Sequence, residues 1–125
     1  MSQNIKFNYL YRDAGNYKSW GEIIFANSDN MLINEIEKRL KKAFDQEIYF
    51  IADQINVGSL FYEEIMDDDH CYHEYYSIEF SEKETSDPLN RTIKIFIEQI
   101  ESEALHGWCV FDPMDRHSAG ILQSQ

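Results

Sequence analysis

The fold is constrained most by residues 5–12, in which two kinds of side chain alternate along the chain. Every second residue is apolar or aromatic: Ile5, Phe7, Tyr9 and Tyr11. The residues between them are mostly polar: Lys6, Asn8, Leu10 and Arg12. A period of two is typical of a β-strand that buries one face and turns the other to solvent. We therefore expect a half-buried strand here.

The segments that follow indicate a hairpin and then a helix. Residues 13–19 contain Gly15 and Asn16, which adopt turn conformations at low cost, and the apolar run of residues 20–26 comes next. Residues 31–44 carry apolar side chains at helical spacing. Their acidic residues come early and their basic residues late, which is the order that the helix dipole favours.

The second half of the chain has two more strand patterns and one more helix pattern. Residues 47–55 have the pattern of a third strand and residues 73–82 that of a fourth, with Tyr76 and Ile78 on one face and Tyr75 and Ser77 on the other. An Asp-Pro pair at positions 87 and 88 predicts a helix over residues 88–105, in which Asp87 is the N-cap. Residues 108–111 are expected to form a final strand or a docked extension.

These elements together predict an α+β fold in the order ββαββα. We expect a two-layer sandwich, in which an antiparallel sheet of about four strands carries both helices on one face. A length of 125 residues suits one domain. We therefore predict a single domain over residues 1–111 and a C-terminal extension or mobile tail over residues 112–125.

The charge of the chain is strongly negative and unevenly spread. The formal net charge is -12, and residues 63–87 contribute -9 of it, with ten acidic residues against Lys83. A surface this negative repels phosphate, so we expect no direct binding to nucleic acid or to an anionic membrane. Aromatic residues make up 14% of the chain, which excludes an intrinsically disordered acidic protein.

Cysteine content and the N-terminal segment bear on location. The only cysteines are Cys71 and Cys109, too few for a disulfide scaffold, and Cys109 is expected in the core between Trp108 and Val110. No apolar leader or membrane-spanning run is evident. We therefore expect a cytoplasmic protein.

The sequence contains no glycine-rich phosphate loop, and we expect no cofactor.

Two histidines beside acidic residues raise the alternative of a metal site. His70, His73 and Glu74 are suitable ligands for zinc, iron or manganese. If a strand already begins at residue 70, however, alternation places His70 and His73 on opposite faces, and they cannot share one ion. Calcium binding by Asp67, Asp68 and Asp69 is a weaker alternative, because consecutive Asp residues lack EF-hand geometry. We expect no metal.

A second alternative is acid–base catalysis. Arg12, Asp13, His73 and Glu74 could act together if the first and fourth strands are neighbours. Arg12 and Asp13 are also typical of a salt bridge and a turn at a strand end. We therefore lean towards a protein that is not an enzyme.

The acidic segment itself suggests a binding face for a basic protein. Its carboxylates would steer a positively charged partner, and its aromatic residues would supply anchors. The residues expected to contact the partner are Phe61, Tyr62, Glu63, Glu64, Asp67, Asp68, Asp69, Tyr72, Glu74 and Tyr75. A solvated acidic strand edge that only aids solubility is the alternative.

Two stretches resemble small bacterial proteins to which no activity is assigned. Residues 9–25 read YLYRDAGNYKSWGEIIF and residues 67–79 read DDDHCYHEYYSIE. The family combines a YRD-x-x-NYK-x-x-G-E stretch with an acidic D-H-x-[YW]-H-E segment. Beside Glu74, the resemblance singles out a possible polar site: Arg12, Asp13, Tyr17, Trp20, Glu22 and His73.

The sequence as a whole favours a non-enzymatic, acidic interaction protein that binds a basic protein partner. Immunity proteins and phage-encoded inhibitors are the analogy, which is one of size and charge alone. A small enzyme or metal-binding domain is the first alternative, centred on Arg12, Asp13, His70, His73 and Glu74. The other is a structural or self-associating domain, such as a homodimer.

Overall fold

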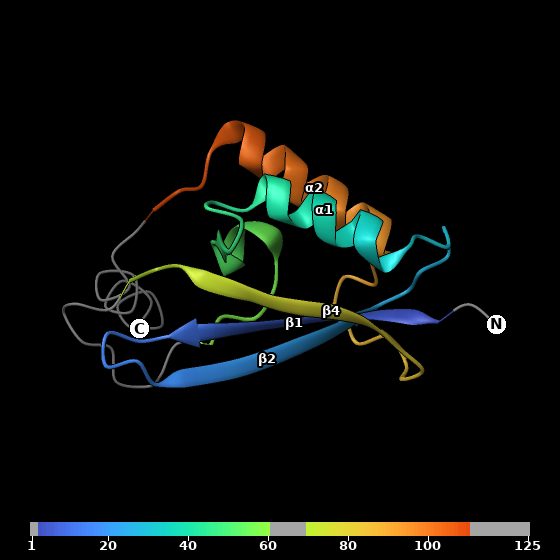
Figure 1. Cartoon of the computed structure of the whole chain (residues 1–125), viewed down its shortest axis with the longest axis horizontal. Helices are drawn as coiled ribbons and strands as arrows, with labels where there is room; N and C mark the ends of the chain where they lie inside the picture. The colour runs from blue at the N-terminus through green and yellow to red at the C-terminus, as the bar shows by residue number, and fades with distance from the viewer. Residues whose placement is uncertain (1–2, 61–69, 111–125) are drawn as a thin grey trace, which may run out of the picture.

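The computed structural model of the chain describes residues 3–60 and 70–110. It has an α+β fold, in which a curled antiparallel sheet carries two helices on one side (Figure 1). The elements are β1 (Asn4–Arg12), β2 (Lys18–Phe25), α1 (Ile33–Ala43), β3 (Tyr49–Phe50), a 3-10 helix η1 (Ala52–Ile55), β4 (His73–Ser81) and α2 (Ile93–His106). The predicted fold class and element order are confirmed. No helix among the described residues is long and apolar enough to cross a membrane.

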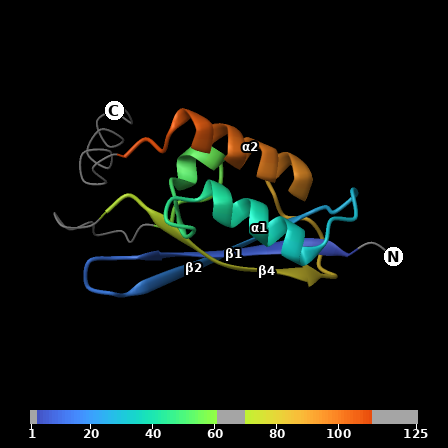
Figure 2. The same cartoon turned by 45° about the horizontal axis from the view of Figure 1, so that its top comes forward.

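The central strand is β1, because the strand order is β2-β1-β4-β3. Its residue Phe7 lies opposite Ile23 of β2 and Ile78 of β4. The Phe7 side chain is fully buried, and its ring centroid lies 5.2 Å from that of Phe96 of α2. The alternating apolar residues of β1 thus form the floor of the core, and both helices pack above them (Figure 2).

A β-bulge interrupts the pairing of β1 with β4. Asn8 pairs with Ser77 while its neighbour Tyr9 pairs with Tyr75, so Tyr76 is an extra residue on β4. The predicted alternation in β4 is therefore wrong at one step, from Tyr76 to Ser77, and it resumes from Ser77 to Ile78. Tyr75 and Ile78 are buried, whereas Tyr76 is 61% exposed. The bulge turns two successive side chains, Tyr76 and Ser77, away from the helices.

The second helix begins later than predicted. Its N-cap is Thr92, whose hydroxyl oxygen accepts a hydrogen bond from the Ile95 amide at 3.2 Å. The Asp-Pro signal opens a turn instead, in which the Asn90 amide donates to the Asp87 carbonyl and Asn90 has a φ of 52°. A left-handed residue ends helical propagation, so α2 starts only after this turn.

Asp87 holds a buried arginine rather than capping the helix. Arg91 donates to the Asp87 carboxylate from Nε and Nη2, both at 2.9 Å, and to the carbonyls of Ile55 and Asn56. Burial alone would raise the pKa of Asp87, but its hydrogen bonds with Arg91 lower it below the usual range. Arg91 therefore ties the end of η1 to the turn that precedes α2.

The predicted strand over residues 47–55 is wrong for most of its length. Only Tyr49–Phe50 pairs with β4, and Ala52–Ile55 forms the 3-10 helix η1. A tight turn before β3 has two left-handed residues, Gln46 and Glu47, and Asn56 ends η1 in the same conformation. These breaks leave room for only two residues of strand.

The segment after α2 docks without forming a strand. Trp108 packs partly buried against the core, and its Nε1 donates to the Ala43 carbonyl at 3.3 Å. Cys109 is exposed, so the prediction that it belongs to the core is wrong. Its amide donates to the Gln54 side chain at the surface instead. The predicted tail, residues 112–125, lies outside the described residues.

Candidate functional site

The side of the sheet away from the helices carries polar side chains and exposed aromatic rings. We call this surface the open face. Its members are Lys6, Asn8, Leu10 and Arg12 of β1, Lys18, Trp20 and Glu22 of β2, and Glu74, Tyr76, Ser77 and Glu79 of β4. Within the described part of the chain, no helix covers it (Figures 1 and 2).

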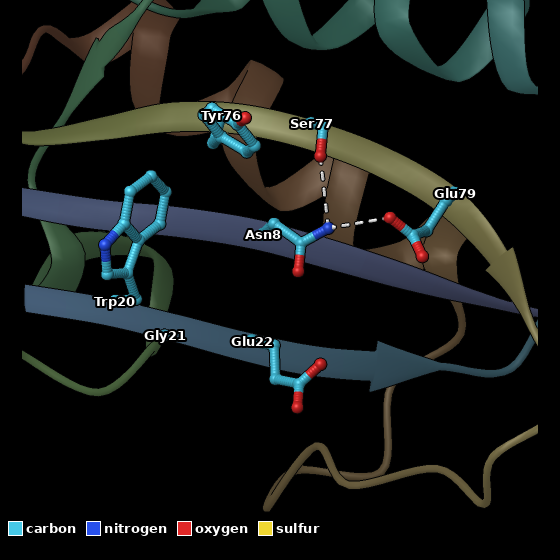
Figure 3. A pocket seen from close by; sticks show the side chains of 7 residues that line it. All are labelled: Asn8, Trp20, Gly21, Glu22, Tyr76, Ser77 and Glu79. Atoms are coloured by element: carbon cyan, nitrogen blue, oxygen red, sulfur yellow. Dashed lines mark hydrogen bonds between the residues drawn. The ribbon is translucent and has the colours of Figure 1, made fainter.

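A shallow groove of about 410 Å³ runs across the open face. We call it the sheet groove; its lining residues are Asn8, Trp20, Gly21, Glu22, Tyr76, Ser77 and Glu79. Figure 3 shows Trp20 and Tyr76 towards one end, Asn8 in the middle, and Glu22 and Glu79 on opposite sides of Asn8. The groove therefore has an aromatic end and an acidic end.

The aromatic end is an edge-to-face pair. The ring centroids of Trp20 and Tyr76 lie 4.9 Å apart at an interplanar angle of 84°. The two residues are 54% and 61% exposed, and between their strands Leu10 is only 3% exposed. Such a pair keeps a large apolar area at the surface, which is typical of anchors in protein interfaces.

Gly21 allows the strand beneath this pair to lie close to the core. A Cβ atom at this position would come within 2.9 Å of Cζ of Tyr9, which lies opposite Gly21 on β1. The Tyr9 hydroxyl donates to the Gly58 carbonyl at 2.7 Å. The absence of a side chain at Gly21 therefore makes room for the Tyr9 ring and fixes the back of the groove.

The acidic end is organised by hydrogen bonds and one lysine. Asn8 Nδ2 donates to Ser77 Oγ at 3.1 Å and to Glu79 Oε2 at 3.3 Å. Lys6 Nζ lies 3.3 Å from Glu22 Oε2 and 3.6 Å from Glu79 Oε1. The lysine side chain is 18% exposed, whereas the two carboxylate side chains are 49% and 55% exposed. Lys6 thus holds both carboxylates from below while they face solvent.

Two of the predicted polar residues form an ion pair beside the groove. Arg12 Nε donates to Glu74 Oε2 at 3.0 Å, because β1 and β4 are neighbours. This hydrogen bond and the charge of Glu74 raise the pKa of Arg12. Asp13 and Tyr17 lie in the turn that follows, where the Asp13 carboxylate accepts from the Tyr17 amide at 2.9 Å. Each carboxylate here has a structural partner.

His73 lies on the other face of the sheet, away from Arg12 and Glu74. It is fully buried, and its ring centroid lies 5.1 Å from that of Tyr11. Nε2 accepts a hydrogen bond from the Leu60 amide at 2.9 Å, and burial lowers the pKa of His73 to about 4. The structure therefore does not bring the proposed acid–base residues into one site.

The alternative of a metal site has no assembled set of ligands within residues 3–60 and 70–110. No three His, Cys, Asp or Glu side chains among them are placed to hold an ion. His70 Nδ1 accepts from the Tyr72 amide at 3.1 Å, while Glu74 pairs with Arg12. Asp67, Asp68 and Asp69 lie outside the described residues.

The residues expected to bind a partner are only partly described. Those outside the described residues are Phe61, Tyr62, Glu63, Glu64, Asp67, Asp68 and Asp69. Tyr72 is partly buried with its ring centroid 5.8 Å from that of Tyr49. Tyr75 belongs to the core, and its hydroxyl donates to Glu37 Oε2 at 2.9 Å. Tyr75 thus supports the helix layer instead of offering a surface anchor.

The candidate residues selected from the sequence include Trp20 and Glu22 but not the other lining residues, which are Asn8, Gly21, Tyr76, Ser77 and Glu79. The polar side of the alternating strand pattern could have pointed to Asn8, which shares it with Lys6 and Arg12. Ser77 joins the groove beside Tyr76 only because of the bulge, and a bulge leaves no mark in the period-two pattern.

Comparisons of the chain with protein-family models, with curated proteins and with solved structures found no match.

Proposed function

We propose that this protein is a non-enzymatic binding protein whose open face engages a basic protein partner. The observation that carries the proposal is the exposed Trp20–Tyr76 pair beside the carboxylates of Glu22 and Glu79. Aromatic anchors next to acidic groups combine the two contributions that a basic partner requires, namely apolar contact and electrostatic attraction.

Binding is favoured over catalysis by the state of the reactive groups. His73 is buried and bonded to the main chain, and Glu74 is paired with Arg12. The sheet groove holds aromatic, amide, hydroxyl and carboxylate groups, and the Ser77 hydroxyl oxygen accepts a hydrogen bond from the Asn8 amide, which cannot serve as a base. Its contents suit recognition of a surface better than a proton-transfer reaction.

A basic partner is favoured by the distribution of charge. The chain has a formal net charge of -12, and β4 lies within its most acidic segment, residues 63–87. Glu74 and Glu79 of β4 lie on the open face itself. The resulting field would attract a positively charged protein and speed its association, as in immunity proteins and inhibitors that mimic acidic ligands.

A cytoplasmic setting belongs to the same proposal. Both cysteines are free, Cys71 in the core and Cys109 at the surface. Free thiols are usual in a reducing compartment. Measurement of the protein in fractionated host cells would test this part of the proposal.

The test compares the protein with a variant that lacks both aromatic anchors. Tagged protein and the double variant Trp20→Ser, Tyr76→Ser are used to capture proteins from a host lysate, with Leu105→Ser as a matched control. Leu105 lies on α2 and is 89% exposed, so its replacement removes apolar surface from the opposite side of the sheet. We expect a basic protein that is retained by the parent and the control but lost from the double variant.

The captured protein is then measured for salt dependence. Raising the salt from about 0.1 M to about 1 M shortens the Debye length from about 10 Å to about 3 Å, and the association rate should fall accordingly. A partner that the double variant retains, or one whose association rate is insensitive to salt, would overturn the proposal. Circular dichroism of each variant checks that its fold is intact.

A further inference from the structure

We infer that the sheet groove receives an arginine side chain of the partner, with its guanidinium between the aromatic pair and the carboxylates of Glu22 and Glu79. This inference rests on the proposed function and deepens it, because it names the group that is recognised. The groove volume of about 410 Å³ is at the small end of ligand sites, which suits one inserted side chain.

The aromatic end supplies a stacking surface. In an edge-to-face pair, the ring that contributes its edge keeps both of its own faces clear of the other ring. Trp20 and Tyr76 are each more than half exposed, so a face in this pair is open to a ligand. A planar guanidinium stacks on such a face and gains from the ring quadrupole.

The acidic end supplies two carboxylates whose side chains are about half exposed. Asn8 uses its amide nitrogen for Ser77 and Glu79, and Figure 3 shows its amide oxygen turned away from both. Glu22 and Glu79 add four carboxylate oxygens, for which Lys6 is the near cation. Lys83 Nζ reaches only to 3.9 Å from Glu22 Oε1. A guanidinium brings five N–H donors, which can replace Lys6 and Lys83 as partners of these exposed oxygens.

Arginine fits this arrangement better than lysine. The aromatic and acidic groups lie at opposite ends of one shallow groove, so a ligand must stack and donate in several directions at once. A guanidinium does both with one rigid plane, whereas an ammonium is a compact and strongly hydrated point charge. The groove therefore discriminates by shape as well as by charge.

The experiment uses small amides of defined chemistry as probes. N-acetyl-arginine amide, N-acetyl-lysine amide and the neutral isostere N-acetyl-citrulline amide are titrated into the whole protein, and binding is followed by NMR. The chain has two tryptophans, so the indole N–H of Trp20 reports on the groove and that of Trp108 is an internal control. Trp108 docks on the helix side, where its indole bonds Ala43.

We expect a saturable shift of the Trp20 signal with arginine amide, a dissociation constant several-fold higher for lysine amide, and no saturable shift with citrulline amide. Glu79→Gln should weaken arginine binding by about threefold, since partly exposed charge pairs contribute little individually. Glu98→Gln, the same change of charge at an exposed position of α2, should leave binding unchanged.

The outcomes separate this inference from the proposed function. Citrulline amide that binds as well as arginine amide, an equal effect of the two Gln variants, or no shift of Trp20 would overturn the arginine site. In each case, loss of a basic partner from the Trp20, Tyr76 double variant would still support the open face as the interface. Retention of the partner by that variant would instead overturn the proposed function.

Discussion

The two faces of the sheet are made by the same strands and have opposite properties. On the covered face, which packs against the helices, Phe7 is fully buried and contacts the rings of Tyr75 of β4 and Phe96 of α2. On the open face, Trp20 and Tyr76 touch each other and keep more than half of their surface in solvent. Aromatic residues therefore serve packing on one face, while on the other they leave apolar area that folding does not use.

The charged groups of the molecule show a parallel difference. Arg91 is 7% exposed, its guanidinium reaches a carboxylate and two carbonyls, and it lies 4.9 Å from the Phe96 ring centroid. Lys6 meets two carboxylates that are about half exposed. A buried charge network is costly to break, whereas an exposed one rearranges at little cost. The open face can thus exchange its ion pairs for those of a partner.

The largest expected effect contrasts one aromatic residue from each face. Phe7→Ala should lower the free energy of unfolding by about 3–5 kcal/mol, because it removes a ring from the centre of the core. Trp20→Ala should cost no more than about 1 kcal/mol, because the ring is largely exposed. Urea denaturation of both variants, with unchanged m-values, gives the comparison.

Equal losses in the two variants would contradict the distinction between the faces. They would mean that Trp20 stabilises the fold, and its exposed ring would then no longer support a role in binding a partner. Tyr17→Ala is a suitable control, since this residue is 72% exposed and lies in the β1–β2 turn.

The covered face was largely predictable from the sequence, because buried side chains recur at the period of the strand or helix that carries them. The alternation around Phe7 predicted β1, and the apolar spacing of Ile36 and Leu40 predicted α1. The start of α2 was not predictable in the same way. Asp87 and Pro88 are equally suited to a helix cap and to a turn, and the choice depends on Arg91, which binds Asp87 only in the folded chain.

The open face was predictable only in part, because its groove depends on contacts between distant segments. Trp20 and Glu22 were singled out as polar-site residues, and both line the groove. His73 was grouped with them, although the alternation of β4 sends it to the core. Tyr76 and Ser77 reach the groove through a change of register between β1 and β4, which the sequence of either strand alone does not specify.

A smaller effect on stability is the pH dependence that arises from His73, which is buried on the covered face. Burial lowers the pKa of His73 to about 4 in the folded protein, from an ordinary value of 6.5. Between these values the unfolded chain binds the proton and the folded chain does not, so stability falls as the pH falls. The free energy of unfolding therefore has its full value with respect to His73 above pH 6.5. About 3 kcal/mol of it should be lost by pH 4.

Urea unfolding of the parent and of His73→Gln across this range measures the effect. Replacement of the buried His73 side chain also changes the packing of the core, so the slope of stability against pH is compared instead of the absolute stability. Asp87 and Glu37 have lowered pKa values and lose their contributions only at the acidic end of the range, so the upper part of it reports on His73. An unchanged slope in the variant would show that His73 does not control the pH dependence.

The smallest expected effect on stability belongs to the ion pairs of the open face. Lys6→Met removes the cation shared by Glu22 and Glu79, and the free energy of unfolding should change by no more than about 1 kcal/mol. Binding of arginine amide should become tighter, because Lys6 no longer competes for the two carboxylates.

Arg39→Met is the matched control on the helix side, where Arg39 Nε donates to Glu101 at 3.0 Å. It should change stability to a similar extent and leave arginine binding unchanged. Weaker binding in Lys6→Met alone would mean that the lysine positions the carboxylates more than it competes for them, and the open face would then be a preorganised site instead of an exchangeable one.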